Sequence, residues 1–557
     1  MATVKNPVLT GFNPDPSMLR VGDDYYIATS TFEWFPGVRI YHSKDLINWE
    51  QLPSPLTRLS QLNMTGEQNS TGVWAPDLSY HDGKFYLIYT DVKTGNGGAT
   101  FYDVRNYLVT TEDICGEWSE PIYLNGSGFD PSLFHDDDGR SWFVNMQFDY
   151  RPWNIRFSGI VMQEYSKEEK KLIGEPKNIF VGTSKRATEG PHIYKKDGYY
   201  YLFCAEGGTK YNHCETVLRS TSIMGPYELS PYSPLITSLP YPQNPLQKAG
   251  HASLTEGNDG KWYLAHLCGR PVGDERCCIL GRETAIQEVV WENGWPRLKG
   301  GVNAPAETFE VPDEPVNGGS VEVFDRMAEL PEMNPSKAWA KTGIWSGCDW
   351  RDDFDKESWD PRFQSLRVPL GERASLSARP GWLRLYGRES LESLYDQSML
   401  AARQQHFYFQ ADTALECNPV SYQQMAGLVY YYDTLSHYYL FMTRDEQQGR
   451  VLTVIHKVLN QFSMPLGAGI SIPEEGTVYL RLKGEKEKAQ FYYSLDGVHY
   501  ERIGEALDAT VLSDDYYKKI STSRFTGAFV GICCQDIAGR GGYADFDYFE
   551  YKAQNPQ

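Results

Sequence analysis

The chain has 557 residues, of which 41% are hydrophobic and 23% charged, as is ordinary for a folded globular protein. Its 53 Lys and Arg against 73 Asp and Glu give a formal net charge of −20. That sign argues against nucleic acid or an anionic membrane as a partner, since both attract clustered basic residues. The length allows two to five domains of about 100–200 residues each.

The N-terminal residues and the cysteines bear on the compartment. Residues 1–13 lack the basic and apolar regions of a secretory signal peptide, and no apolar run approaches the ~18 residues of a membrane span. The 10 cysteines show neither a CxxC spacing nor a Cys/His ligand pattern, so a zinc site is not expected. We therefore expect reduced thiols and a cytoplasmic protein.

Five turn-and-strand segments recur along the first 300 residues. Each has a tight turn, Asp-Gly in four of them, followed by an aromatic run whose last ring falls at 26, 86, 143, 201 and 263. An Asp-Gly turn between two strand-like runs is a strong hairpin signal. All-β units of about 60 residues, repeated five times, predict a five-bladed β-propeller rather than a sandwich of unrelated hairpins.

A second position recurs in the same register, 9–13 residues before each aromatic marker. Since the innermost strands of a propeller face one funnel, this position would bring five side chains together: Asp15, Trp74, Asp130, Glu189 and His251. Three carboxylates, an indole and an imidazole in one concave site are typical of a catalytic centre. The alternative, that each acid merely caps a turn, explains poorly why three of five units carry one there.

A different pattern follows Pro296, where the repeat stops. Residues 311–350 are rich in Pro and Gly and are expected to be a linker between a catalytic domain of residues 1–310 and a second domain of residues 351–557. In this second domain Leu383 and Leu385 alternate with outward-facing neighbours. Some 200 residues of short strands without a helical period predict a β-sandwich.

Carboxylates without a metal-ligand cluster or a nucleophilic Ser or Cys motif suit acid–base work on a bond that needs a proton and a water. Glycoside hydrolysis uses one protonated carboxyl to release the leaving oxygen and one carboxylate as base or nucleophile. Aromatic side chains beside the acids would offer flat apolar surfaces to a sugar ring.

Five motifs stand in order along the chain: Asn13-Pro14-Asp15-Pro16-Ser17, Gly72-Val73-Trp74-Ala75-Pro76, Gly128-Phe129-Asp130-Pro131-Ser132, Thr188-Glu189-Gly190-Pro191 and Leu280-Gly281-Arg282-Glu283-Thr284. Together they resemble glycoside hydrolase family 43, and most closely its β-xylosidase branch. The resemblance implies an all-β protein, a five-bladed β-propeller followed by a β-sandwich of the concanavalin-like jelly-roll type. It covers residues 3–300 densely and residues 350–555 more loosely.

The resemblance also implies catalytic roles. Asp15 matches the general base and Glu189 the general acid, while Asp130 matches a third carboxylate that raises the pKa of the acid and orients it. Arg282 matches an arginine that reaches the sugar hydroxyls and the carboxylates.

The remaining matches concern the pocket. Four residues match positions in the family that form the pocket wall around the terminal sugar: Phe32, Trp74, Ala75 and Thr209. Phe525 matches an aromatic that the sandwich lends to close the pocket, as suits an exo-enzyme. His251 matches a central histidine that in some relatives lies near a cation or a water. No cofactor is expected to be required, and a divalent cation such as calcium is an option near His251.

The implied activity is inverting release of D-xylose from the non-reducing ends of 1,4-β-xylo-oligosaccharides by a homo-oligomer, a dimer or a tetramer. An α-L-arabinofuranosidase, or an enzyme with both activities, is the alternative, because furanose and pyranose pentoses present similar hydroxyls. A non-catalytic carbohydrate-binding propeller is more remote, since burying unpaired carboxylates costs several kcal/mol without a functional return.

Overall fold

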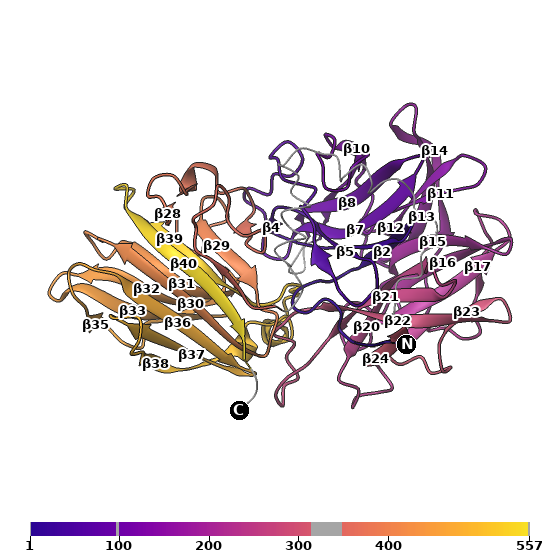
Figure 1. Cartoon of the computed structure of the whole chain (residues 1–557). Helices are drawn as coiled ribbons and strands as arrows, with labels where there is room; N and C mark the ends of the chain where they lie inside the picture. The colour runs from indigo at the N-terminus through magenta and orange to yellow at the C-terminus, as the bar shows by residue number, and fades with distance from the viewer. Residues whose placement is uncertain (1, 96–99, 313–347, 555–557) are drawn as a thin grey trace.

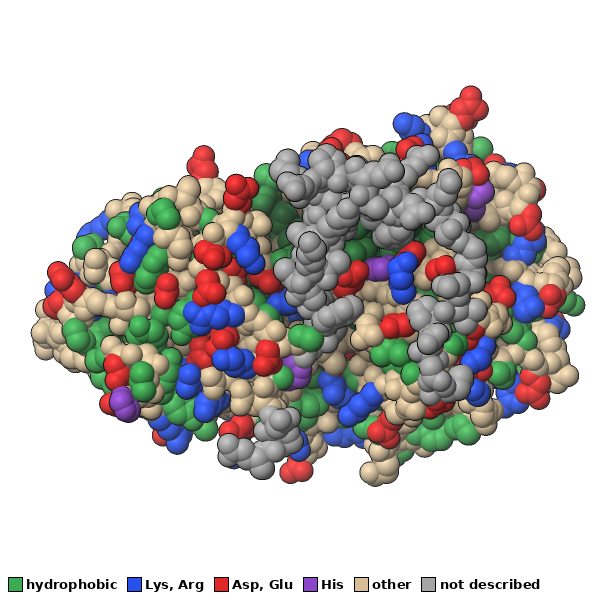
Figure 2. Space-filling view, viewed as in Figure 1, with side chains coloured by type: hydrophobic (Ala, Val, Ile, Leu, Met, Phe, Trp, Pro, Cys, Tyr) green, Lys and Arg blue, Asp and Glu red, His purple; other side chains and the backbone are tan. Residues whose placement is uncertain are grey.

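The computed structural model describes residues 2–95, 100–312 and 348–554. They form two all-β domains that lie side by side, a propeller (indigo to magenta) and a sandwich (orange to yellow) (Figure 1). Within these ranges, no helix is long and apolar enough to cross a membrane. On the face shown in Figure 2, Asp and Glu are interspersed with Lys and Arg over both domains, and the described residues form no continuous basic stripe there.

Five antiparallel sheets, each built from one stretch of chain, form the blades of the propeller. The first strand of each blade contacts the first strand of the next around a closed ring. From the inside outward the strands are β2 (Ser17–Val21), β3 (Asp24–Thr29), β5 (Arg39–Ser43) and β6 (Glu50–Gln51); β7 (Gly72–His81), β8 (Lys84–Thr94), β9 (Asp103–Thr111) and β10 (Ile122–Asn125); β11 (Ser132–His135), β12 (Ser141–Phe148), β13 (Phe157–Ser166) and β14 (Lys171–Phe180); β15 (Glu189–Lys196), β16 (Tyr199–Glu206), β17 (Cys214–Ser220) and β18 (Glu228–Leu229), with β19 (Ile236–Thr237) also on β17; and β20 (Gln247–Glu256), β21 (Trp262–Gly269), β22 (Glu283–Glu292) and β23 (Trp295–Leu298).

The predicted hairpins each join the first and second strands of a blade. Gly83 and Gly198, in two of these turns, have φ of +77° and +80°, a conformation that glycine adopts without steric cost. The recurring aromatics fall on the second strands. Strand β1 (Ala2–Lys5) then pairs with β24 (Thr308–Val311), which ties the start of the domain to its end. The predicted five-bladed propeller is therefore confirmed.

Two antiparallel sheets face each other in the sandwich, which confirms that prediction as well. Leu383 and Leu385 are fully buried between them, as their alternation predicts. The first sheet contains β27 (Ala374–Ser375), β28 (Leu383–Tyr386), β40 (Tyr543–Ala553), β30 (Tyr408–Cys417), β36 (Val478–Glu485), β37 (Lys488–Ser494) and β38 (Glu501–Asp508), with β25 (Trp350–Asp352) on β40. The second contains β29 (Ser398–Arg403), β39 (Phe529–Asp536), β31 (Gln424–Asp433), β32 (Ser436–Asp445), β33 (Gly449–Val458) and β34 (Gln461–Ser463), with β35 (Ile470–Ser471) on β33.

The two domains share a hydrophobic core and a small sheet. Strand β4 (Trp34–Phe35) of the propeller pairs with β26 (Ser365–Leu366), which lies between the sandwich strands β25 and β27 in the chain. The Trp34 indole stacks on Phe529 of the sandwich, with ring centroids 3.7 Å apart and an interplanar angle of 11°. These contacts fix the sandwich against the propeller and so position its loops. Most of the predicted linker, residues 313–347, lies outside the described residues.

Candidate active site

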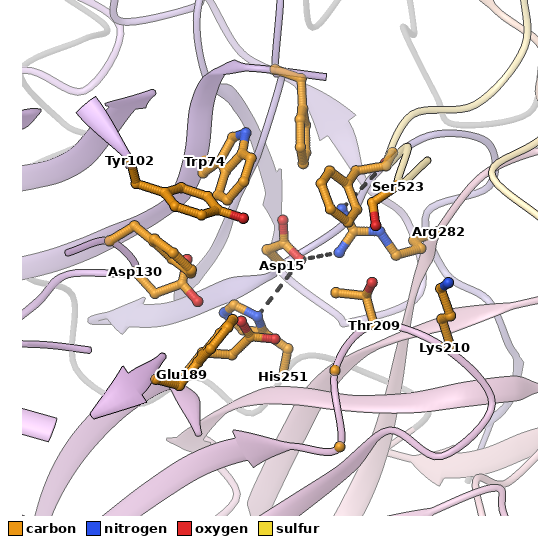
Figure 3. Close-up of a pocket in the computed structure, with 16 residues that line it drawn as sticks. Asp15, Trp74, Tyr102, Asp130, Glu189, Thr209, Lys210, His251, Arg282 and Ser523 are labelled. Carbon is orange, nitrogen blue, oxygen red and sulfur yellow. Dashed lines mark hydrogen bonds and ion pairs between the residues drawn. The ribbon is translucent and has the colours of Figure 1, made fainter. Parts of the chain in front are cut away.

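A cavity of about 280 Å³ lies between the inner strands of the propeller and one loop of the sandwich (Figure 3). It brings together nine of the ten predicted site residues, all but Ala75. Its lining consists of Asp15, Phe32, Trp74, Tyr102, Phe129, Asp130, Phe157, Glu189, Gly207, Gly208, Thr209, Lys210, His251, Arg282, Ser523 and Phe525.

Irregular backbone turns the recurring side chains into this cavity. Asp15, Asp130 and His251 have φ of +56°, +53° and +48°, in the left-handed region that Asp and His enter more readily than most residues. Pairing registers shift at the corresponding points of blades 2, 4 and 5. Bulges of this kind re-aim side chains beside active sites, so the repeat delivers one group per blade to the same space.

Gly190 allows His251 and Asp130 to lie close to the backbone beside Glu189. Its φ is +58°, and a Cβ at this position would lie 2.9 Å from His251 Nε2. Its amide donates to Asp130 Oδ2 at 3.1 Å. Glycine after Glu189 therefore leaves room for the imidazole and ties the backbone of the predicted acid to Asp130.

Asp15 is buried, yet its surroundings stabilise the charged form. Arg282 Nη1 donates to its Oδ1 at 2.7 Å, and Ser30 Oγ donates to its Oδ2 at 2.7 Å. His251 Nδ1 lies 3.7 Å from Oδ1 (Figure 3). Burial raises the pKa of Asp15, but Arg282, then His251 and Ser30, outweigh it, and the pKa lies below its ordinary value. Asp15 is thus ionised at neutral pH and can accept a proton.

Glu189 has the opposite character. Burial, followed by the negative charge of Asp15, raises its pKa to about 8. Burial, then the charges of Glu189 and Asp15, also raises the pKa of Asp130 well above its ordinary value. The repulsion between the Asp130 and Glu189 carboxyls acts on both groups and helps to keep a proton on the pair, as the role that the resemblance implied for Asp130 requires. The pKa of Asp15 is lowered and that of Glu189 is raised, which suits them to act as a base and an acid.

Ala75 is not among the residues that line the cavity, and its place in the pocket wall stays a prediction. Its amide donates to Ser30 Oγ at 2.7 Å, and that hydroxyl in turn donates to Asp15. The reason is the register shift between Trp74 and Asp77, which directs the Ala75 amide toward the site. Ala75 therefore positions Ser30, which sequence reasoning missed.

The sandwich closes the cavity with Phe525. Its ring lies 5.4 Å from that of Trp74 and 6.0 Å from that of Phe32. Its amide donates to Ser70 Oγ, and its carbonyl accepts from Arg282 Nη2, both at 3.2 Å. Arg282 thereby links the lid backbone to Asp15.

Ion pairs hold the segment that carries Phe525. Arg524 Nε lies 2.7 Å from Asp433 Oδ2. Lys248 of the propeller, whose side chain is fully buried, contacts Asp514 and Asp515 of the sandwich at 3.1 and 2.9 Å. Because these partners are far apart in sequence, no local pattern could predict them.

Several lining residues carried no sequence signal. Tyr102 and Phe157 lie where the second strand of a blade leads to the third, outside the recurring register, and only the aromatic content pointed to side chains of this kind. Lys210 belongs to a loop without a motif, whereas Ser523 opens the segment of residues 523–527 that the resemblance identifies as the lid loop.

The surroundings of His251 do not fit a directly bound calcium ion, which prefers several oxygen ligands. Asp15 is already engaged by Arg282 and Ser30, and His213 and His192 are the other titratable neighbours. Among the described residues, no group of three His, Cys, Asp or Glu side chains could hold a metal.

A propeller whose central pocket pairs an ionised with a protonated carboxyl, closed by a sandwich loop, defines an all-β glycoside hydrolase. Residues 4–296 match the model of glycosyl hydrolases family 43, and residues 351–552 match the beta xylosidase C-terminal concanavalin A-like domain. The chain belongs to glycoside hydrolase family 43.

Full-length relatives support the assignment. The chain is 48% identical to a beta-xylosidase of Bacillus subtilis over 99% of both chains. It is 44% identical to xylosidase/arabinosidase 43B of Humicola insolens over 100% of this chain and 99% of the relative. The crystal structure of a xylan beta-1,4-xylosidase from Bacillus halodurans is similar with a TM-score of 0.90 and 51% identity, over 99% of this chain and 100% of the other.

Proposed function

We propose that the protein is an exo-acting, inverting β-xylosidase that releases D-xylose from the non-reducing ends of 1,4-β-xylo-oligosaccharides. The observation that carries this proposal is the pair of opposed carboxyls in one closed pocket. Asp15 is kept ionised by Arg282, whereas Glu189, with a pKa of about 8, keeps its proton at neutral pH. The likeness to proteins named β-xylosidases supports the substrate class.

In the proposed reaction Glu189 gives its proton to the glycosidic oxygen while the bond from that oxygen to the anomeric carbon breaks. Asp15 takes a proton from a water, whose oxygen bonds to the anomeric carbon from the opposite face. The products are xylose of inverted configuration and the shortened oligosaccharide, with Asp15 protonated and Glu189 ionised. Exchange of protons with solvent restores both groups.

The shape of the pocket supports exo action. Its volume of about 280 Å³ is slightly below the range for small-molecule sites, about 300–1,000 Å³. The rings of Phe32, Trp74 and Phe525 form one apolar wall. A pocket of this size suits one terminal pentose rather than the middle of a chain.

Activity on α-L-arabinofuranosides is the second candidate, because the Humicola insolens relative is named for both sugars. Parallel rates on an aryl xyloside and an aryl arabinofuranoside decide between single and double activity. A purely carbohydrate-binding propeller is disfavoured, because it gives no use to a buried, protonated Glu189 beside an ionised Asp15. Binding of xylobiose without release of xylose would favour it.

We also propose a cytoplasmic homo-oligomer, a dimer or a tetramer. The 10 cysteines all lie within the described ranges and form no disulfide there, which suits a reducing compartment. Sedimentation of the intact protein tests the oligomeric state, and fractionation of the source cells tests the location.

Substrates with different leaving groups distinguish the role of Glu189 from that of Asp15. Glu189→Ala should retain far more activity on a dinitrophenyl xyloside than on xylobiose, because the phenolate leaves without a proton. Asp15→Ala should lose activity on both by similar factors of ~10²–10⁴, since both need the water. Asp136, a buried carboxylate that does not line the pocket, offers a control: Asp136→Ala should leave the ratio of the two rates unchanged. The reverse pattern would exchange the two roles, and unchanged rates in both variants would place the chemistry elsewhere.

A further inference from the structure

Two loops of the propeller form one side of the pocket mouth. The residues just before β9 contribute Tyr102 to the lining, and the connection from β12 to β13 ends at Phe157, which also lines the pocket. In Figure 3 Tyr102 lies across Asp15 from Lys210. This side of the mouth is therefore aromatic, whereas Lys210 and Ser523 make the opposite side polar.

Ring contacts hold the two loops together. Tyr102 lies 4.5 Å from Phe148, and Phe101 lies 4.9 Å from Tyr150 between ring centroids. The guanidinium of Arg156 lies over both Tyr102 and Phe148, at 5.8 and 5.2 Å. These contacts fix Phe101 and Tyr102 against the second loop, and a binding platform benefits from side chains that are ordered in advance.

Hydrogen bonds close the second loop on itself. The Asp149 amide donates to the Arg156 carbonyl at 2.7 Å, and Asn154 Nδ2 donates to the Asp149 carboxylate at 2.8 Å. Arg151 Nε also donates to this carboxylate, at 2.9 Å. These bonds tie the tip of the loop, which carries Trp153, to the segment that leads to Phe157 in the pocket lining. Four residues span at most about 14 Å, which bounds the distance between the Cα atoms of Trp153 and Phe157.

Large apolar side chains are exposed along this rim. The exposed fractions are 78% for Trp153, 56% for Phe101 and 54% for Tyr150. Scattered exposed apolar residues are ordinary, but a group on two adjoining loops beside a pocket marks a binding surface. The flat carbon–hydrogen faces of pyranose rings pack against aromatic rings, while their hydroxyls stay in water.

We propose that Phe101, Tyr150 and Trp153 form an aromatic platform that binds the sugar units of the leaving group as they emerge from the pocket. This inference rests on the proposed function, which puts the terminal xylose at Asp15 and so directs the rest of the oligosaccharide out through the mouth. The platform makes the enzyme favour longer xylo-oligosaccharides over xylobiose, because only longer chains reach Trp153.

The test compares chain lengths. For Trp153→Ala, kcat/KM for xylohexaose should fall about fivefold relative to kcat/KM for xylobiose, the size of one aromatic contact. Trp153→Phe, which keeps a ring, should restore most of the ratio. Phe462→Ala removes an aromatic of similar exposure, 59%, from the sandwich strand β34 and should leave the ratio unchanged. An unchanged ratio in Trp153→Ala would overturn the platform.

A binding measurement separates this proposal from the proposed function. In the Glu189→Ala background, Trp153→Ala should weaken the binding of xylohexaose, measured by calorimetry, about fivefold more than that of xylobiose. If the wild type releases no xylose but this length-dependent loss persists, the proposed function fails and the platform stands. If Trp153→Ala changes the sedimenting mass and leaves length dependence as in the wild type, the rim contacts a second copy of the chain and the platform is refuted.

Discussion

Substitution of Ser30 should change the pKa of Asp15, the predicted base. Its hydroxyl donates to Asp15 Oδ2 at 2.7 Å inside the protein, and this bond stabilises only the ionised carboxylate. A hydrogen bond to a charged group contributes about 1.5–3 kcal/mol. At about 1.36 kcal/mol per pKa unit, Ser30→Ala should raise the pKa of Asp15 by about one to two units.

The assay is the pH dependence of kcat/KM on an uncharged xyloside, which reports the free enzyme. The base works only when deprotonated, so a higher pKa moves the acid limb of the profile to higher pH by the same one to two units. The alkaline limb, set by Glu189 with its pKa of about 8, should move little. Stability should also fall by about 1–3 kcal/mol, because the Ala75 amide loses its acceptor.

Ser17 supplies a matched control in the same propeller. Its buried hydroxyl donates to Asp77 Oδ1 at 2.9 Å and accepts from the Leu78 amide, as Ser30 does with Asp15 and Ala75. Ser17→Ala should therefore lose comparable stability and keep the wild-type pH profile. If Ser30→Ala also kept the wild-type acid limb, Asp15 would not be the base.

Other predictions follow from the same site. Asp130→Asn should lower kcat and move the alkaline limb to lower pH, because the mutual repulsion of the Asp130 and Glu189 carboxyls raises the pKa of the pair. An unchanged alkaline limb would mean that Asp130 only positions its neighbours. Phe525→Ala should raise KM for xylobiose about tenfold, because it removes ring contacts worth roughly 1.4 kcal/mol. The melting temperature should change by no more than a few degrees. Wild-type kinetics in this variant would show that the sandwich loop does not take part in substrate binding.

The repeat made the carboxyls predictable. Asp15, Asp130, Glu189 and His251 occupy one register position in separate blades, and blade geometry alone brings such positions together. The lid depended on resemblance, since nothing in the residues around Phe525 shows that their loop reaches another domain.

The groups that tune the site could not be predicted. The contact of Ser30 with Asp15 joins residues 15 positions apart at the ends of two strands of the first blade, and the contact of the Ala75 amide with Ser30 lies where the register of β7 shifts. The Lys248 ion pairs join residues 266 and 267 positions apart. Their position follows from how two finished domains meet, which periodicity and turn signals do not encode.

The most direct test of the central claim is the configuration of the sugar at the moment of release. Xylobiose is added to the wild-type enzyme in an NMR tube, and the anomeric protons are followed before mutarotation brings α- and β-xylose to equilibrium. A base at Asp15 that activates water in a single step predicts that α-xylose appears first. Initial release of β-xylose would mean that a side chain attacks the sugar, and it would contradict the roles assigned to Asp15 and Glu189.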